Sequence, residues 1–228
     1  GQPVIHVRSG EIHHYELLIR MKVDGEIISP GEFLPHAESS DLIIEIDRWA
    51  IRRGIEYGRT CPVAINLSGR SLSVPGLGDY IARTLSEVGT DPANVQFEVT
   101  ETAAAENLDD ARHLVDELAE LGCGSSLDDF GTGYGTFTYL KYLPVNELKI
   151  DVTFIRDLND ETGRRVVESI IAVAQSFDMS TVAEGVEDGE TLRLLDRMQV
   201  DLAQGYHIGR PAPMDSVVEK TGAGTEVN

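Results

Sequence analysis

The sequence contains only two cysteines, Cys61 and Cys123, and no apolar stretch of membrane-spanning length. The two cysteines do not have metal-ligand spacing, so we expect both to be free, buried thiols in a reducing cytosol. A membrane-crossing helix needs roughly 20 apolar residues in succession, and no run approaches that length. No signal peptide is visible either, so we expect a cytoplasmic domain that makes no membrane contact itself.

Positive charge is also scarce. The 228 residues include 19 lysines and arginines against 39 aspartates and glutamates, for a net charge of −20. Binding to DNA, RNA or anionic lipid relies on surplus lysine and arginine, so we expect none of these as partners. A small anionic ligand stays possible where metal ions and a local basic side chain override the negative field.

Short apolar runs rich in β-branched residues alternate with longer amphipathic stretches, which is typical of βα units around a parallel sheet. We expect strands near 3–7, 12–19, 62–66, 95–99, 123–128, 146–150, 180–184 and 201–204. The helical patterns lie near 40–57, 76–88, 107–121, 136–142, 160–178 and 188–198. Eight strands joined by helices predict an α/β fold, a (βα)8 barrel of the TIM type. An open doubly wound sheet is the alternative, but it calls for a phosphate-binding fingerprint after the first strand, and none is present.

No linker, repeat or low-complexity segment divides the chain, so we expect one barrel domain over residues 1–228. Residues 1–213 are expected to be ordered, with a C-terminal helix or tail at 214–228 that frays. The chain begins inside an expected strand, which suggests a domain excised from a longer multidomain protein. In the helix from Asp41, we expect Ile44, Trp49 and Ile51 to be core residues.

Acids, amides and a lysine stand at the ends of seven of the expected strands. They are Glu16, Asn66, Glu98 with Glu101, Asp128 with Asp129, Lys149 with Asp151, Glu184 with Glu187, and Gln204. Any one of them alone is best interpreted as a turn former or a solvent-facing residue. Together they are hard to explain by chance, because a barrel brings the carboxyl ends of its strands to one mouth. Oxygen ligands without histidine or cysteine favour hard cations such as Mg²⁺, Mn²⁺ or Ca²⁺ over zinc.

The segment LDDFGTGYG, residues 127–135, is the centre of this pattern. Two neighbouring aspartates repel one another, and a divalent cation would compensate them. Asp128 could bridge two cations, the second held by Asp129 with Glu184 or Glu187. Two ions would clamp the attacking water and the leaving oxygen of a phosphoryl displacement. Lys149 would orient the water or neutralise charge in the transition state.

Seven motifs, in order and spacing, resemble those of EAL-domain cyclic di-GMP phosphodiesterases. They are YELLIR, INLS, FEVTE, DDFGTGYG, LKID, VAEGVE and QGYHIGRP, and the resemblance runs from residue 2 to residue 211. It implies a modified TIM barrel from a bacterial signalling enzyme that hydrolyses cyclic di-GMP to linear pGpG. The cofactors it implies are two Mg²⁺ or Mn²⁺ ions per active site, with Ca²⁺ inhibitory.

The resemblance also assigns roles to individual residues. Lys149 resembles the catalytic lysine that contacts the nucleophilic water, and Glu184 resembles the general base. Glu101 resembles the glutamate that anchors the glycine-rich loop. Glu16, Asn66, Glu98 and Asp128 match ligands of the first metal, Asp129 and Glu187 match ligands of the second, and Gln2, Arg20 and Gln204 match substrate contacts.

The departures from the family pattern are few. Leu17 stands where the family name has alanine, and Gly135 is an added glycine in the loop. His13 and His14 precede Glu16 but match no family ligand, so we expect them to be structural. The alternative to an active enzyme is a non-catalytic cyclic di-GMP receptor, although such relatives typically lack ligands that this chain retains. The resemblance further favours a homodimer that uses the helix near 136–142, with GGDEF or sensory domains elsewhere in the full-length protein.

Overall fold

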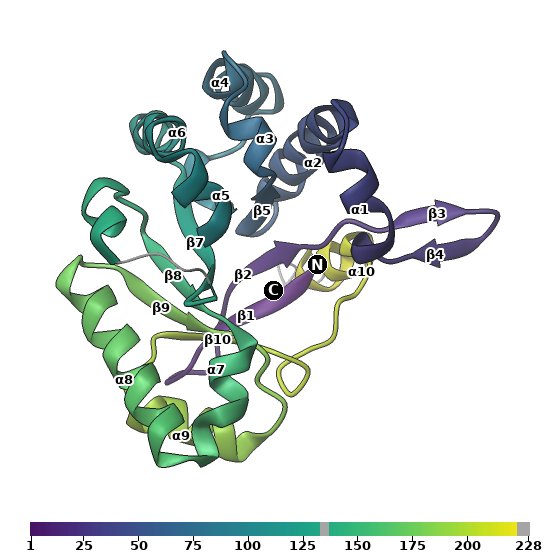
Figure 1. The fold of residues 1–228 in the computed structure, drawn as a ribbon. Helices are drawn as coiled ribbons and strands as arrows, with labels where there is room; N and C mark the ends of the chain where they lie inside the picture. Colours follow the sequence, from purple (N-terminus) through teal and green to yellow (C-terminus); the bar gives the residue numbers. More distant parts are fainter. Residues whose placement is uncertain (133–136, 223–228) are drawn as a thin grey trace.

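The structure is a computed structural model, which describes residues 1–132 and 137–222. Its centre is a closed barrel of eight strands in the order β1-β10-β9-β8-β7-β6-β5-β2 (Figure 1). The strands are β1 (Gln2–His6), β2 (Ile12–Leu17), β5 (Val63–Leu67), β6 (Val95–Thr100), β7 (Gly124–Phe130), β8 (Glu147–Ile150), β9 (Ser180–Ala183) and β10 (Leu202–Gln204). These are the eight strands expected from the sequence, so the barrel prediction is confirmed and the open sheet is not formed.

The first strand departs from the regular TIM pattern. β1 runs antiparallel to both of its neighbours, with Gln2 opposite Glu16 on β2 and Val4 opposite Gln204 on β10. The other strand pairs of the barrel are parallel. Because β1 is reversed, its first residue, Gln2, lies at the same mouth as the carboxyl ends of the other seven strands.

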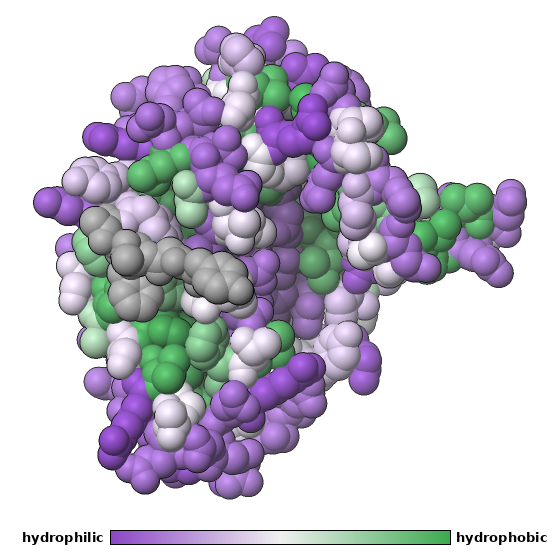
Figure 2. Space-filling view, in the orientation of Figure 1, coloured by the Kyte–Doolittle hydropathy of each residue, from purple (hydrophilic) through white to green (hydrophobic). Residues whose placement is uncertain are grey.

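Long amphipathic helices cover the outside of the barrel (Figure 1), and hydrophilic residues make up most of the surface on the face that Figure 2 shows. They are α2 (Leu42–Gly58), α4 (Leu77–Val88), α6 (Leu108–Leu121), α8 (Glu161–Ser176) and α9 (Gly189–Arg197). In α6, the buried Ala111, Leu114 and Leu118 recur at helical spacing and face the sheet. Gly122 then ends the helix with φ of 87°, a left-handed conformation that glycine adopts without steric cost.

Several short elements lie outside the expected pattern. They are the hairpin of β3 (Met21–Val23) and β4 (Glu26–Ile28), the helices α1 (Pro30–Glu38), α3 (Gly69–Leu72), α5 (Glu101–Glu106) and α7 (Val152–Arg156), and the 3-10 turns η1 (Pro92–Asn94) and η3 (Asp157–Asn159). Most span less than two helical turns, too few for a periodic apolar signal. The helix expected near 136–142 is instead a 3-10 segment, η2 (Phe137–Tyr142). Gly135 and residue 136 lie outside the described residues.

The core of α2 differs from the expectation at one position. Ile51 is fully buried and Ile44 is half-buried, but the Trp49 side chain is 55% exposed, so its assignment to the core is wrong. The buried face of α2 runs through Ile43, Asp47, Ile51 and Ile55, each four residues from the next. Trp49 lies two residues from Ile51, about 200° around the helix, and therefore points to solvent.

The last described element is α10 (Met214–Gly222), within the expected C-terminal helix or tail. Met214 is buried and packs with Tyr15, Cys61 and Val63 beside the barrel. Cys61 and Cys123 are both free and buried, as expected. Among the described residues, no helix combines the length and the apolarity needed to span a membrane.

Candidate active site

Lys149 lies at the centre of the site, fully buried in the barrel and surrounded by carboxylates. Its Nζ lies 2.8 Å from Glu98 Oε2, 2.8 Å from Glu184 Oε1, 3.1 Å from Asp128 Oδ2 and 3.7 Å from Glu16 Oε2. These side chains come from five regions of the chain, on β8, β6, β7, β2 and the residue after β9. One cation thus neutralises part of the charge of four acids.

Glu16 is held in place by amides as well as by Lys149. Asn66 Nδ2 donates a hydrogen bond to Oε1 of Glu16 at 2.9 Å, and Gln204 Nε2 donates to Oε2 at 2.6 Å. Asn66 lies directly opposite Glu98 in the parallel register of β5 and β6. The strand ends therefore deliver five of the predicted site residues, Glu16, Asn66, Glu98, Lys149 and Gln204, to one connected network.

The pKa values of these groups reflect a competition between burial and charge. Burial raises the pKa of Glu98 well above its ordinary value, and the charge of Lys149 opposes that rise. For Glu16, burial acts in the same direction, but Lys149 and the amides of Gln204 and Asn66 outweigh it and lower the pKa. Burial raises the pKa of Glu184 to about 8, against the charge of Lys149. Burial disfavours the charged lysine, yet the surrounding carboxylates, Glu98 foremost, raise the pKa of Lys149 well above its ordinary value.

Asp128 and Asp129 lie in an irregularity of β7. The register between β7 and β8 shifts between Leu127 and Phe130, which places one extra residue on β7. Asp129 has a φ of 56°, uncommon for a residue other than glycine. Its backbone N–H donates to Oδ1 of Asp128 at 2.8 Å. A bulge of this kind re-aims side chains, and here carboxylate oxygens of Asp128, Asp129 and Glu184 come within 4.8 Å of one another.

The glycine-rich loop begins with a contact to Glu101. The backbone N–H of Gly131 donates to Oε2 of Glu101 at 2.7 Å, the position predicted for the loop anchor. Gly131 has a φ of 97°, and a Cβ there would lie 2.6 Å from the Phe154 ring, so the turn requires glycine. Gly135, the added glycine of this loop, falls within residues 133–136, which are not among those described.

A cavity of about 370 Å³ opens above this cluster. Its lining includes Gln2, Glu16, Asp128, Arg156, Glu184, Glu187, Gln204 and Tyr206. Gln2 is buried, and its Nε2 donates to the carbonyl of Gly209 at 3.1 Å. Arg156 was not identified from the sequence, because the short helix α7 that carries it has no periodic signal. A cavity of this size is within the range of small-molecule sites.

Two predicted site residues lie apart from the buried cluster. Arg20 is exposed, and its guanidinium donates to the carbonyl of Ile19 at 2.8 Å. The Glu187 side chain is 64% exposed at the cavity rim, 3.6 Å from the Arg156 guanidinium. Of the two glutamates considered for the second acidic group, Glu184 is the one that joins Asp128 and Asp129.

The residues present fit divalent cations. Glu16, Glu98 and Asp128 form one group of carboxylates, and Asp128, Asp129 and Glu184 form a second, with Asp128 common to both. Among the described residues, Oε1 of Glu98 and Oε1 of Gln204 are buried without a hydrogen-bond partner. Buried oxygens that lack a partner are unfavourable unless a further group binds them. An all-oxygen donor set with the amide of Asn66 nearby is the kind that hard cations prefer.

A βα barrel whose carboxyl-end mouth carries paired groups of carboxylates around one lysine defines an acidic, metal-binding type of barrel domain. The model of the EAL domain family matches residues 2–211, and the chain belongs to that family. The motif resemblance noted in the sequence is thereby confirmed.

Named relatives give this assignment further detail. The chain is 34% identical over 228 residues to the cyclic di-GMP phosphodiesterase NbdA of Pseudomonas aeruginosa, an alignment that covers 96% of the chain and 29% of NbdA. It is 35% identical over 221 residues to the cyclic di-GMP phosphodiesterase PdeB of Shewanella oneidensis, covering 93% of the chain and 26% of PdeB. The PaMucR phosphodiesterase in complex with c-di-GMP superposes with a TM-score of 0.89 at 33% identity, covering 95% of this chain and 92% of that one. The chain therefore spans less than a third of either curated relative.

Proposed function

We propose that this domain is a metal-dependent phosphodiesterase that hydrolyses cyclic di-GMP to linear pGpG. The observation that carries the proposal is the buried cluster in which Lys149 contacts Glu16, Glu98, Asp128 and Glu184. The similarity to phosphodiesterases named for cyclic di-GMP supports the choice of substrate. The proposed cofactors are two Mg²⁺ or Mn²⁺ ions per site, with Ca²⁺ as an inhibitor.

The acidic side chains divide between two cation sites. Glu16, Asn66, Glu98 and Asp128 would hold one cation. Asp128 and Asp129 would hold the other, with Glu187 reaching in from the cavity rim. When bound, such ions lower the pKa of a coordinated water and polarise the phosphoryl group. Glu101 would keep the Asp128–Asp129 turn in place through its bond to the Gly131 amide.

Lys149 and Glu184 carry the proton-transfer part of the proposal. Hydrolysis forms a bond between phosphorus and the oxygen of a water and breaks the bond between phosphorus and O3′. The water gives up one proton to a base, and the O3′ oxygen takes up one proton from solvent and leaves as a hydroxyl. Glu184 Oε1 would accept the water proton, since burial raises the pKa of this carboxyl to about 8, close to the operating pH. Lys149 Nζ, 2.8 Å from Glu184, would orient the water and offset negative charge at phosphorus.

Amide and basic side chains would position the substrate. Gln2 and Gln204 line the cavity, and Arg20 follows β2 at its carboxyl end. Arg156, also in the cavity lining, adds a positive charge in a chain with a net charge of −20. A local cation of this kind is needed for two phosphodiester groups to approach an acidic mouth.

The wider setting of the domain is part of the same proposal. Because the chain spans 29% of NbdA and 26% of PdeB, we place it within a longer bacterial protein that carries GGDEF or sensory domains. We place the domain in the cytoplasm, and propose that it forms a homodimer through the region of η2, which follows the glycine-rich loop.

The test is to incubate the purified domain with cyclic di-GMP and Mg²⁺ or Mn²⁺ and to separate the nucleotides by chromatography. We expect pGpG to form, and excess EDTA to stop its formation. Asp128→Asn should reduce the rate at least a hundredfold, because Asp128 belongs to both carboxylate groups. Asp109→Asn, at an exposed position in the first turn of α6, is the matched control and should leave the rate unchanged.

Two outcomes would overturn the proposal. Binding of cyclic di-GMP without formation of pGpG would identify the domain as a receptor instead. A wild-type rate in Asp128→Asn, or turnover that persists in excess EDTA, would contradict the metal-dependent mechanism.

A further inference from the structure

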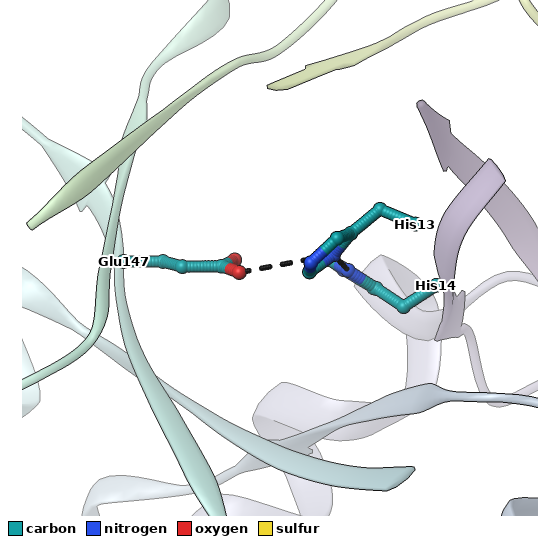
Figure 3. Close-up of side chains that lie close together, drawn as sticks. All are labelled: His13, His14 and Glu147. Atoms are coloured by element: carbon teal, nitrogen blue, oxygen red, sulfur yellow. Dashed lines mark hydrogen bonds and ion pairs between the residues drawn. The ribbon is translucent and has the colours of Figure 1, made fainter. Parts of the chain in front are cut away.

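A second polar cluster lies at the opposite end of the barrel interior. His13 and His14 on β2 and Glu147, the first residue of β8, point toward one another across the barrel (Figure 3). The Nδ1 atoms of the two histidines share a hydrogen bond of 2.8 Å, and Nδ1 of His13 lies 3.9 Å from Oε1 of Glu147. One possible ligand atom from each of the three residues lies within 4.8 Å of the other two. The cluster is at the amino-terminal mouth, whereas the site around Lys149 opens at the carboxyl-terminal mouth.

Consecutive residues of a regular strand point to opposite faces, so His13 and His14 should not meet. The pairing of β1 with β2 explains why they do. Val4 lies opposite His14 and Ile5 lies opposite Ile12, so His13 is an extra residue on β2 and forms a β-bulge. Bulges re-aim side chains, and this one brings both imidazoles to Glu147.

The protein alone leaves this layer of the barrel under-satisfied. The His14 side chain is 3% exposed, and its Nε2 has no hydrogen-bond partner among the described residues. Ser126, which lies opposite Glu147 in the register of β7 and β8, also has a buried Oγ without a partner in that part of the chain. Buried polar atoms without partners are rare in folded proteins, and a bound water or ion usually supplies the missing partner.

The distances are close to those of ligands around one tetrahedral ion. With metal–nitrogen bonds of about 2.1 Å, two ligand atoms of a tetrahedral zinc site are separated by about 3.4 Å. The two separations given above, 2.8 Å and 3.9 Å, lie on either side of that value. Metal binding would replace the hydrogen bond between the two imidazoles, so their Nδ1 atoms would move apart and the Glu147 oxygen would move closer to His13. Burial lowers the pKa of His13, with a further contribution from His6, which favours the neutral imidazole that binds metals.

The surroundings of the cluster suit a bound ion. Gln96 Nε2 donates to Oε2 of Glu147 at 2.8 Å, which orients the carboxylate and leaves Oε1 facing His13. Ligating carboxylates are usually hydrogen-bonded in this way. The His13 side chain is partly exposed, so an ion has a path from solvent.

We propose that His13, His14 and Glu147 bind one divalent transition-metal ion of the zinc class at the amino-terminal mouth of the barrel. Two imidazoles and one carboxylate are borderline ligands, which select zinc-like ions over the hard cations of the carboxylate site. The bound ion links β2, which carries Glu16, to β8, which carries Lys149. It does so at the end of the barrel opposite the carboxylate site. This site is independent of the proposed phosphodiesterase activity.

The test uses the purified chain, stripped of metal and equilibrated with excess Mg²⁺ so that the carboxylate site is saturated. Zn²⁺ is then titrated by calorimetry, and Co²⁺ is titrated in parallel by absorption spectroscopy. We expect one Zn²⁺ per chain and the visible absorption of nitrogen-ligated, four-coordinate Co²⁺. His13→Ala and Glu147→Gln should each weaken Zn²⁺ binding at least tenfold.

Two control variants separate this site from others. His113→Ala removes an exposed histidine that lies 3.5 Å from Glu117, and it should leave Zn²⁺ affinity unchanged. Asp128→Asn removes a ligand of the carboxylate site and should leave the Co²⁺ spectrum unchanged.

Glu147→Gln retains an oxygen acceptor for Gln96, so we expect the fold to be preserved. Circular dichroism checks this. The proposal is wrong if Zn²⁺ does not bind in the presence of Mg²⁺, or if His13→Ala and Glu147→Gln bind it with wild-type affinity.

Discussion

The two ends of the barrel interior are both polar, but they balance charge in different ways. At the carboxyl-terminal mouth, four carboxylates surround the buried cation Lys149. At the amino-terminal mouth, Glu147 accepts a hydrogen bond from the amide of Gln96 and lies 3.9 Å from the imidazole of His13, and the charge of Asp201 also acts on it. The first layer has an excess of negative charge that divalent cations would offset. The cluster at the amino-terminal mouth offers lone pairs of imidazole nitrogen and carboxylate oxygen, and it carries less negative charge than the site around Lys149.

The same structural device builds both layers. A bulge in β7 directs Asp128 and Asp129 toward Glu184, and a bulge in β2 directs His13 and His14 toward Glu147. In each case, two consecutive polar residues that a regular strand would send to opposite faces reach the same cluster. A bulge in a barrel strand thus doubles the number of ligands that one strand supplies.

The largest effect we expect is from Lys149→Met in the absence of metal. The substitution leaves three buried carboxylates and the half-buried Glu184 without their common cation, which should lower the free energy of unfolding by about 3–5 kcal/mol. Mg²⁺ should restore part of this loss, because it supplies the missing positive charge. Denaturant unfolding in EDTA and in Mg²⁺ measures both values. Lys22→Met, at an exposed position on β3, is the control, and equal stability of Lys149→Met and wild type in EDTA would contradict this account of charge balance.

The next effect separates two glutamates of the carboxyl-terminal mouth. Glu184 is half-buried and contacts Lys149, whereas Glu187 is exposed and pairs with Arg156. We expect Glu184→Gln to reduce kcat for cyclic di-GMP by about 10²–10⁴-fold, the usual contribution of a general base. Glu187→Gln should reduce kcat less than about tenfold. Steady-state kinetics at saturating Mg²⁺ compares the two variants, and the reverse order would exchange their roles.

The smallest effect is at the amino-terminal mouth. Burial raises the pKa of Glu147, against a hydrogen bond from Gln96. The native state therefore binds the proton more tightly than the unfolded state does. The resulting stabilisation is complete below the ordinary glutamate pKa and is lost as the pH rises through the raised value.

In EDTA, Glu147→Gln should flatten this pH dependence and raise the free energy of unfolding near neutral pH by about 1 kcal/mol. Thermal unfolding across the acidic and neutral range measures it, with the exposed Glu120→Gln as the control. A steeper pH dependence in Glu147→Gln would contradict the prediction.

Much of the fold and the site could be predicted from the chain alone. All eight barrel strands were recognisable, because buried strands are short apolar runs that end in polar residues. Glu16, Asn66, Glu98, Asp128, Lys149, Glu184 and Gln204 were predicted from those ends, and the structure brings them together. Arg156 was missed because α7 is too short to be periodic. Trp49 was wrongly assigned to the core because hydrophobicity alone does not show which face of a helix is buried.

The sequence by itself determined that a βα barrel would form and that oxygen ligands would gather at one of its mouths. Alternation and strand order are local properties, and parallel strands place their carboxyl ends on the same side. Only the tertiary structure decided which acids share Lys149, and that His13 and His14 both face Glu147. These outcomes depend on bulges and on the reversed direction of β1, which arise from pairing between segments far apart in the chain.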